Sequence, residues 1–192
     1  MRVIAFTGLP GSGKSVAVEA ARARGIPVVR MGRFVLEEVA RRGHPTTEEH
    51  IGPVATGMRQ EHGDDVWARR TIEALRAGGV EGVDPTTRIV VVDGVRSLAE
   101  VARFRHDLGS DFTLIAIDAP DEMRHMRILG RGREDDAAEH ALLHQRDERE
   151  RGWGVDAAIR QADHMLRNDV DDVDAFTRQV ASVLDRVLAS TA

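Results

Sequence analysis

Short apolar runs alternate along the chain with longer stretches in which apolar residues recur at helical spacing. The runs are rich in β-branched residues, as expected for buried strands, whereas the longer stretches put apolar side chains on one helical face. We expect strands at residues 1–7, 26–31, 89–93, 112–118 and 164–168. This alternation predicts an α/β, three-layer fold with a parallel, five-stranded sheet covered by helices.

Helical periodicity fills the segments between these runs. The final periodic stretch has an apolar face, which predicts a closing helix packed on the sheet. That face comprises Val173, Phe176, Val180, Val183, Leu184 and Val187. We expect helices at residues 16–24, 34–42, 48–61, 66–76, 123–129, 137–151 and 173–188.

Two connections are longer than a plain crossover, which needs about a dozen residues. The link between the second and third strands reads as three helices, which indicates an insertion at about residues 32–85. The second long link joins two helical patterns through a segment of glycines, arginines and acids at residues 130–136. A glycine-hinged, arginine-bearing segment is what a mobile lid over a phosphate site requires.

The composition favours a single domain spanning residues 1–192, because this length supports one substantial core. There are no cysteines, so disulfides and thiolate metal sites are excluded. The chain opens on a strand pattern without signal-peptide features, and no apolar stretch reaches membrane-spanning length. We therefore expect a cytoplasmic protein with no membrane partner. The formal net charge of −5 argues against nucleic acid as a partner.

The first strand is followed by a run that fits Gly-x-x-x-x-Gly-Lys-Ser, the phosphate-binding P-loop motif. A strand precedes it and a helix follows it, which is the context that the motif needs. Its glycines let backbone N–H groups turn toward a phosphate chain, and the helix N-terminus adds partial positive charge. The alternative is a glycine-rich turn that binds nothing. The predicted nucleotide contacts are Gly8, Pro10, Gly11, Ser12, Gly13, Lys14, Ser15 and Val16.

Lys14 is the only lysine among 27 basic residues, all the others being arginines. A GC-rich genome accounts for the scarcity of lysine but not for the position of this one. A compact ammonium suits a tight phosphate cradle better than a planar guanidinium. We therefore expect Lys14 to contact the outer phosphates of ATP during catalysis, with the Ser15 hydroxyl on Mg²⁺.

The third strand ends in Asp93, followed by Gly94, Val95 and Arg96. In P-loop proteins an acid at the end of a neighbouring strand holds Mg²⁺ directly or through water, so Asp93 is a candidate metal ligand. Arg96 would project over the same crevice, as a catalytic and acceptor-binding residue. The alternatives are a helix-capping carboxylate for Asp93 and a surface salt bridge for Arg96.

These motifs, with the segment 131–136, give the chain its resemblance to the adenylate-kinase-like nucleoside and nucleotide kinases. More closely, it resembles an archaeal family of uncharacterised P-loop proteins usually described as related to dephospho-CoA kinase. The likeness extends through residues 146–154 and 162–165 and covers nearly the whole chain.

The resemblance implies an acceptor-binding helical insertion at about 32–85 and a short lid at about 128–140. It implies that Arg131 and Arg133 of the lid swing onto the transferring phosphoryl group, with Arg131 also contacting the nucleotide. Either Arg146 or Arg149 would contact phosphates from the next helix, and the sequence leaves that choice open. It also implies that Asn168 lies near the adenine.

The chain departs from the related sequences after the second strand. Those tend to read Met-Gly-Asp with an arginine three residues later, whereas here Met31 and Gly32 are followed by Arg33, and Leu36 stands at the later position. This difference either abolishes one activity of the related proteins or lets Arg33 bind the acceptor from a new position. Arg59 is a further acceptor-binding candidate on helical spacing, with an ordinary surface residue as its alternative.

Two functional hypotheses follow. The first is an enzyme that transfers a phosphoryl group from ATP, with Mg²⁺, to a small nucleotide-like acceptor. The second is a nucleotide-binding switch or slow ATPase without kinase activity. Trp67 and Trp153 are interpreted as core or interface anchors, with the alternative that Trp153, which stands between two glycines, borders the nucleotide. A homodimer stays open.

Overall fold

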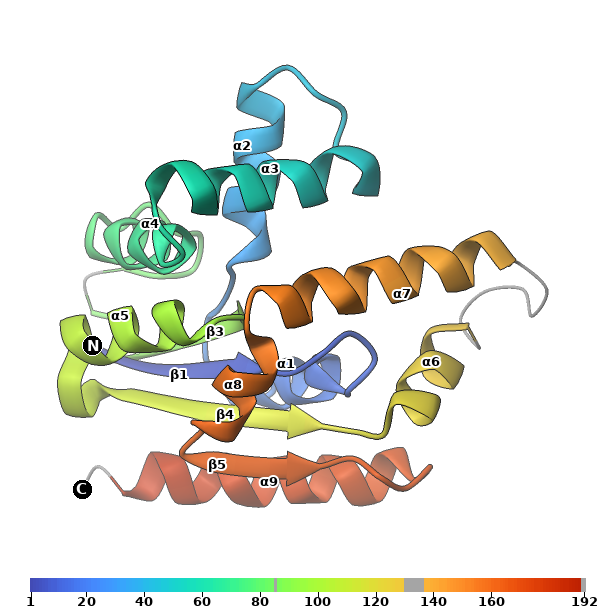
Figure 1. Ribbon diagram of the computed structural model, residues 1–192. Coiled ribbons are helices and arrows are strands. Elements are labelled where there is room, and N and C mark those ends of the chain that lie inside the picture. Colours follow the sequence, from blue (N-terminus) through green and yellow to red (C-terminus); the bar gives the residue numbers. More distant parts are fainter. Residues whose placement is uncertain (85, 130–136, 191–192) are drawn as a thin grey trace.

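The sheet has five strands in the computed structural model, which describes residues 1–84, 86–129 and 137–190 (Figure 1). They are β1 Arg2–Thr7, β2 Val28–Arg30, β3 Ile89–Val95, β4 Phe112–Asp118 and β5 His164–Arg167. Their order is β2-β3-β1-β4-β5, and neighbouring strands are parallel. The predicted α/β, three-layer fold with a five-stranded parallel sheet is confirmed.

Strand β1 lies at the centre of the sheet. Val3 pairs with Val90 of β3 on one side and with Phe112 of β4 on the other. Every residue of β1 is buried. A strand covered on both faces needs a continuous apolar run rather than an alternating one, which is why this segment was recognisable from sequence.

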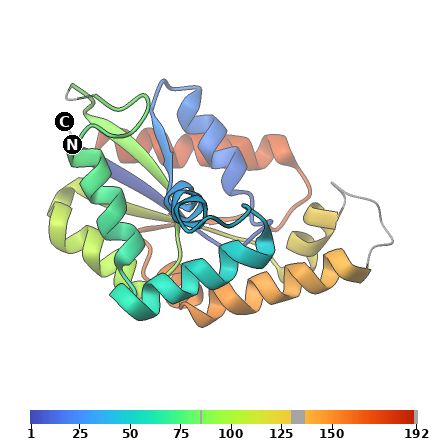
Figure 2. The same cartoon turned by 90° about the horizontal axis from the view of Figure 1, so that it is seen from above.

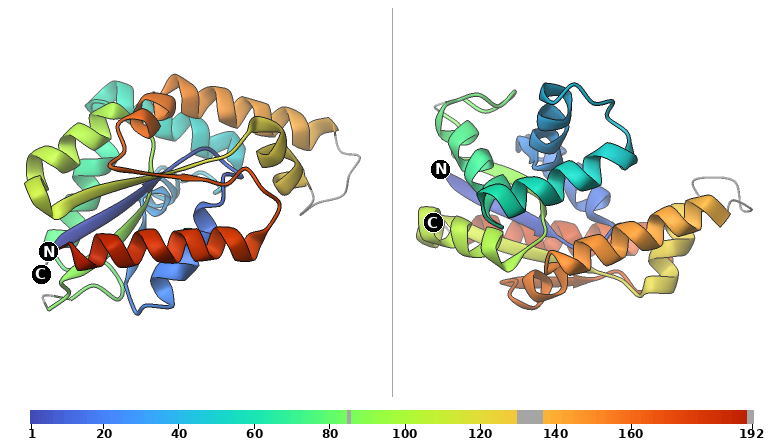
Figure 3. Two further views of the ribbon diagram at one scale, coloured as in Figure 1. Left: turned by 90° about the horizontal axis from the view of Figure 1, so that it is seen from below. Right: turned by 45° about the horizontal axis from the view of Figure 1, so that its top comes forward.

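Alternate residues of β1 point to opposite sides of the sheet. Because the residues on both sides are apolar, each face of the sheet is covered by helices. Ile4 and Phe6 share a core with α1 (Lys14–Arg22) and α9 (Val173–Ala189). Val3 and Ala5 belong to the core on the opposite face. The remaining helices are α2 Gly32–Arg41, α3 Glu48–His62, α4 Val66–Arg76, α5 Leu98–Leu108, α6 Asp121–Leu129, α7 Ala137–Gly152 and α8 Val155–Arg160, with a 3-10 turn at Gly109–Asp111. Figure 3 shows α1 and α9 on one side of the sheet, with α5 and α8 on the other.

The sequence pattern did not predict α5 or α8. A fully buried Glu100 on α5 stands where the pattern required an apolar residue, and the six residues of α8 are too few to show a helical period.

The interpretation of Val173 as a core residue was wrong. It is the first residue of α9 and is 66% exposed, because the helix begins beyond the packed part of its apolar face.

The three helices α2, α3 and α4 connect β2 to β3. Helices α2 and α3 stand above the sheet, and α4 lies beside α3 and above α5 (Figure 1). Seen from above, α3 runs beside α7 (Figure 2). Glu48 at the start of α3 forms an ion pair with Arg149 of α7 at 3.3 Å. Two helices distant in sequence therefore lie side by side.

Candidate nucleotide and acceptor site

The loop between β1 and α1 has a backbone that only glycine suits at two positions. Gly8 and Gly11 have φ angles of 141° and 78°, in the region that side chains disfavour. A Cβ at Gly11 would lie 2.5 Å from the carbonyl oxygen of Arg124, and one at Gly8 would collide with the carbonyl oxygen of Ile117. The loop is thus packed tightly against β4 and α6.

The inner side of this loop offers unused hydrogen-bond donors. The backbone N–H groups of Gly11, Gly13, Lys14 and Ser15 donate to no acceptor in the described part of the chain. The buried Ser12 hydroxyl also has no partner there. Unpaired amides at a helix N-terminus form a ready anion site, so these groups fit a phosphate chain.

Lys14 folds over the loop that carries it. Its Nζ donates to the carbonyl oxygens of Gly8 at 2.5 Å and Leu9 at 2.9 Å. Burial lowers the pKa of Lys14 to about 8, although the negative charges of Glu150 and Asp93 oppose that shift. An anion bound in the loop would favour the protonated form of Lys14, because the acids of the surrounding protein offset the effect of burial only in part.

Two side chains outside the motif hold the loop in place. Arg124, fully buried on α6, donates to the carbonyl oxygen of Pro10 at 2.7 Å and pairs with Asp147 of α7 at 2.5 Å. Asn168, after β5, donates from Nδ2 to the carbonyl oxygen of Ser12 at 2.9 Å. Sequence reasoning missed Arg124, because nothing local distinguishes it from the many other arginines.

A small cavity of about 140 Å³ adjoins the loop beside Asn168. Arg127 of α6 forms one wall and donates to the backbone and side-chain oxygens of Asn168 at 3.1 and 3.2 Å. Residues 170–173 and Phe176 form the other. The predicted placement of Asn168 near an adenine is compatible with this cavity, although its amide also braces the loop.

Asp93 and Ser15 are the predicted metal ligands. Asp93 lies near the carboxyl end of β3, and its Oδ1 is buried without a hydrogen-bond partner in the described residues. Its charge acts on Lys14, and Ser15 is exposed in the first turn of α1. An orphaned carboxylate oxygen near a phosphate cradle suits Mg²⁺, which takes oxygen ligands and keeps several waters. These residues therefore fit the metal.

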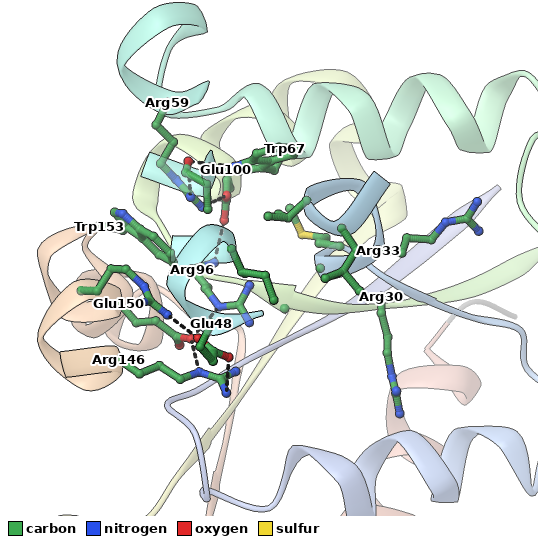
Figure 4. Close-up of a pocket in the computed structure, with 18 residues that line it drawn as sticks. Arg30, Arg33, Glu48, Arg59, Trp67, Arg96, Glu100, Arg146, Glu150 and Trp153 are labelled. Carbon is green, nitrogen blue, oxygen red and sulfur yellow. Dashed lines mark hydrogen bonds and ion pairs between the residues drawn. The ribbon is translucent and has the colours of Figure 1, made fainter. Parts of the chain in front are cut away.

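A larger cavity of about 430 Å³ lies between the ends of β2 and β3 and the helices α2, α3 and α7 (Figure 4). Its wall contains six arginines and three glutamates, so its ionised lining is positive. Two tryptophans and several aliphatic side chains complete it. The charged lining residues are Arg30, Arg33, Arg59, Arg96, Arg146, Arg149, Glu48, Glu100 and Glu150.

Arg96 meets the carboxylate of Glu150 inside this cavity. Nε of Arg96 and Nε of Arg146 each lie 3.2 Å from Oε1 of Glu150 (Figure 4). Burial raises the pKa of Glu150, but the surrounding positive charges, led by Arg96, outweigh it and hold the pKa below its ordinary value. The geometry brings the predicted Arg96 to the pocket, whereas no motif pointed to Glu150.

Arg59 lies in the pocket wall, not on the surface. It is 5% exposed, pairs with the fully buried Glu100 at 2.7 Å, and stacks on Trp153 with 4.1 Å to the ring centroid. The other oxygen of Glu100 accepts from the backbone N–H of Arg96 at 2.6 Å. Arg59 thus braces the wall beside Arg96, and its guanidinium is already committed to a carboxylate.

Arg33 lines the cavity rim but pairs with Glu37 at 3.1 Å, and Figure 4 shows it extending away from the cluster around Glu150. Arg146 and Arg149 both line the cavity. Both arginines pair with Glu48, Arg149 at 3.3 Å and Arg146 at 3.8 Å. They differ in that Arg146 also shares Glu150 with Arg96, at 3.2 Å, whereas Arg149 lies over Trp153.

The lid predictions for Arg131 and Arg133 fall outside the described residues. The helices α6 and α7 on either side are described from residue 121 to 129 and from residue 137 onward.

Among the helices of the described ranges, none combines the length and apolarity that a bilayer crossing requires.

Comparisons with known proteins agree with this geometry. A family model described as an AAA domain, AAA_17, matches residues 7–141. The chain is 44% identical over 188 residues to a UPF0200/UPF0201 protein of Archaeoglobus fulgidus, covering 96% of this chain but 55% of that protein, so it spans about half of that relative's length. It is 41% identical over 191 residues to a UPF0200 protein of Methanosarcina barkeri, covering 100% and 98% of the two chains.

Two solved structures share the fold at low sequence identity. A shikimate kinase from Bacteroides thetaiotaomicron gives a TM-score of 0.58 at 12% identity, with 96% of this chain and 98% of that chain covered. A gluconokinase from Sinorhizobium meliloti 1021 gives 0.53 at 16% identity, with 97% and 93% covered. The likeness is therefore to P-loop kinase folds.

Proposed function

We propose a phosphotransferase function for this chain, which belongs to the UPF0200 family and carries the P-loop AAA domain. The reaction transfers the γ-phosphoryl group of ATP to a small, anionic, nucleotide-like acceptor. The observation that carries the proposal is the adjacency of two sites at the carboxyl ends of the paired strands β1 and β3: an amide cradle closed by Lys14, and the large arginine-lined cavity that contains Gly94 and Arg96.

In this proposal the phosphates of ATP occupy the loop at residues 8–15, with Lys14 on the outer phosphates. The adenine lies toward the cavity beside Arg127 and Asn168. Ser15 and Asp93 hold Mg²⁺, which when bound neutralises charge on the phosphates. The chain's own contribution is positioning and charge compensation.

The acceptor lies in the cavity of about 430 Å³. The excess of arginines over glutamates favours an anion, for which Arg96 and Arg146 are the binding candidates. The Trp153 ring and the aliphatic wall favour a flat, partly apolar body, as in a nucleotide. Two fold neighbours are named as small-molecule kinases, and the resemblance noted in the sequence makes dephospho-CoA the first acceptor to test.

Arg131 and Arg133, which lie outside the described residues, are proposed as contacts of the transferring phosphoryl group. A nucleotide-binding switch or slow ATPase is the second candidate. It is favoured by the pairing of Arg33 with Glu37, which leaves the rim arginine turned away from the pocket.

A turnover assay separates the two candidates. Purified protein with ATP and Mg²⁺ is given dephospho-CoA, adenosine, AMP, shikimate or gluconate, and labelled product is measured beside ATP affinity by calorimetry. Acceptor phosphorylation absent from Lys14→Ala supports the kinase. Tight ATP binding without transfer to any acceptor supports the switch, and failure to bind ATP refutes both.

A further inference from the structure

Glu150 is a buried carboxylate in the wall of the acceptor pocket. It lies on α7, is 2% exposed, and meets Arg96 and Arg146 at 3.2 Å each (Figure 4). Both of these contacts end at Oε1. Within the ranges that the structure describes, no donor reaches Oε2. One oxygen of this carboxylate therefore retains its capacity to accept a hydrogen.

The other two glutamates of the pocket are differently engaged. Both oxygens of Glu100 accept hydrogen bonds, from Arg59 at 2.7 Å and from the backbone of Arg96 at 2.6 Å. Glu48 is 48% exposed at the rim and pairs with Arg149 at 3.3 Å. Glu150 is thus the pocket glutamate, among the described residues, that is both buried and incompletely paired.

Glu150 also lies toward the phosphates. Its partner Arg96 directly follows Val95, which pairs with Thr7 at the start of the phosphate loop. In agreement with this placement, the negative charge of Glu150 opposes the lowering of the pKa of Lys14. A carboxylate here therefore faces the space where the γ-phosphoryl group and the acceptor would meet. The positive groups around Glu150 keep it ionised, so it accepts hydrogens but donates none.

Such a carboxylate discriminates between two classes of nucleophile. The oxygens of a phosphate acceptor carry a negative charge and no hydrogen at neutral pH, so a neighbouring carboxylate would only repel them. A hydroxyl carries a hydrogen that must leave as the new bond to phosphorus forms, and a carboxylate within reach can receive it.

We propose that the acceptor nucleophile is a hydroxyl group and that Glu150 receives its proton, an inference that rests on the proposed phosphotransferase function. The hydroxyl oxygen forms a bond to the γ-phosphorus of ATP while the bond from that phosphorus to the β–γ bridging oxygen breaks. ADP leaves with the electron pair of that bond. The hydroxyl proton passes to Oε2 of Glu150 and then to water when product departs.

The chemical form of the product tests the acceptor class. The compounds used are dephospho-CoA, adenosine, AMP, shikimate and gluconate. Phosphorus NMR distinguishes a new phosphomonoester from a new phosphoanhydride, whereas inorganic phosphate alone is the product expected of a slow ATPase and would count against the inference. An anhydride as the main product overturns the inference while leaving the proposed function intact.

Two matched variants test the role of Glu150. Glu150→Gln keeps an oxygen for Arg96 and Arg146 but is a far poorer proton acceptor, and it should slow single-turnover transfer by roughly a hundredfold or more. ATP affinity should not fall, because the substitution removes a negative charge near Lys14 and the phosphates. Glu48→Gln removes the same charge from the rim of the same pocket and should slow transfer far less.

Each outcome of this comparison decides a question. Equal losses in the two variants, or a Glu150→Gln rate at or above wild type, would overturn the role of Glu150, because net charge or mere obstruction would then explain the data. Absence of transfer to every compound by the wild-type protein, with or without hydrolysis of ATP, counts against the proposed phosphotransferase function itself, and against the inference with it.

Discussion

Replacing Arg124 by methionine should destabilise the protein and weaken nucleotide binding together. The substitution keeps much of the volume of this fully buried side chain but removes its guanidinium. Asp147 then loses a partner at 2.5 Å, and the carbonyl oxygen of Pro10 loses a donor at 2.7 Å. Asp147 is itself buried, so it cannot regain water without local rearrangement.

The magnitude follows from this burial. Removing one partner of a buried ion pair costs about 3–5 kcal/mol in the free energy of unfolding. For a domain of this size, that corresponds to a fall in Tm of roughly 6–20 °C. The loss of the hydrogen bond to Pro10 also frees the phosphate loop, and about 1.4 kcal/mol of lost preorganisation would weaken ATP binding about tenfold.

Arg151→Met is the matched control. Arg151 contacts both oxygens of Asp121, at 2.9 and 3.0 Å, an acid that Arg124 also contacts, but its own side chain is 38% exposed. Exposed pairs contribute at most about 1 kcal/mol. Urea unfolding gives the stability of both variants, and calorimetry with ATP and Mg²⁺ gives their affinity. Similar losses of stability in the two would refute the account of Arg124 as a buried support of the loop.

Three further predictions concern the loop, the metal and an acid outside the site. Lys14→Met should fold but bind ATP roughly a hundredfold more weakly by calorimetry, because charge-assisted hydrogen bonds to phosphate are each worth about 1.5–3 kcal/mol; near-normal affinity would contradict the proposed role. Asp93→Asn should leave ATP affinity in EDTA unchanged and reduce the gain on adding Mg²⁺, whereas an undiminished gain would exclude Asp93 as a ligand. The guanidinium of Arg41, with those of Arg42 and Arg70, holds the pKa of Glu38 well below its ordinary value near 4.5. Glu38 therefore makes its full contribution to stability above about pH 4.5 and loses it as the pH falls further below that value. The free energy of unfolding should then fall more steeply with decreasing pH for the wild type than for Glu38→Gln. Parallel curves would count against the assignment.

Local motifs made the central features predictable from the sequence. The run from Gly8 to Ser15 combines a turn, a helix start and a charge within eight residues, so its geometry is encoded where it acts. The strands were recognisable because both faces of the sheet are covered, which demands apolar runs such as that at residues 89–93. The predicted Asp93 and Arg96 follow the same logic, since the carboxyl end of a strand places them.

Residues positioned by long-range contacts were not predictable in this way. Glu150 appears in the sequence as one charge within an arginine and glutamate run, and only the tertiary fold brings it from α7 to Arg96, which follows β3. Arg124 likewise gains its role through Pro10, far from it in the chain. Arg59 was expected at the pocket from spacing, yet its buried partner Glu100 lies on a helix that the pattern did not reveal.

The central position of β1 has a consequence for synthesis of the chain on the ribosome. Its two neighbours are Ile89–Val95 and Phe112–Asp118, so β1 has no lateral partner until residue 95 at the earliest has been made. Parallel pairing across such separations is slow, and an apolar strand waiting for its neighbours is prone to aggregate. Nascent chains arrested before residue 118 should therefore depend on chaperones, whereas release of the next segment should permit collapse around the waiting strand.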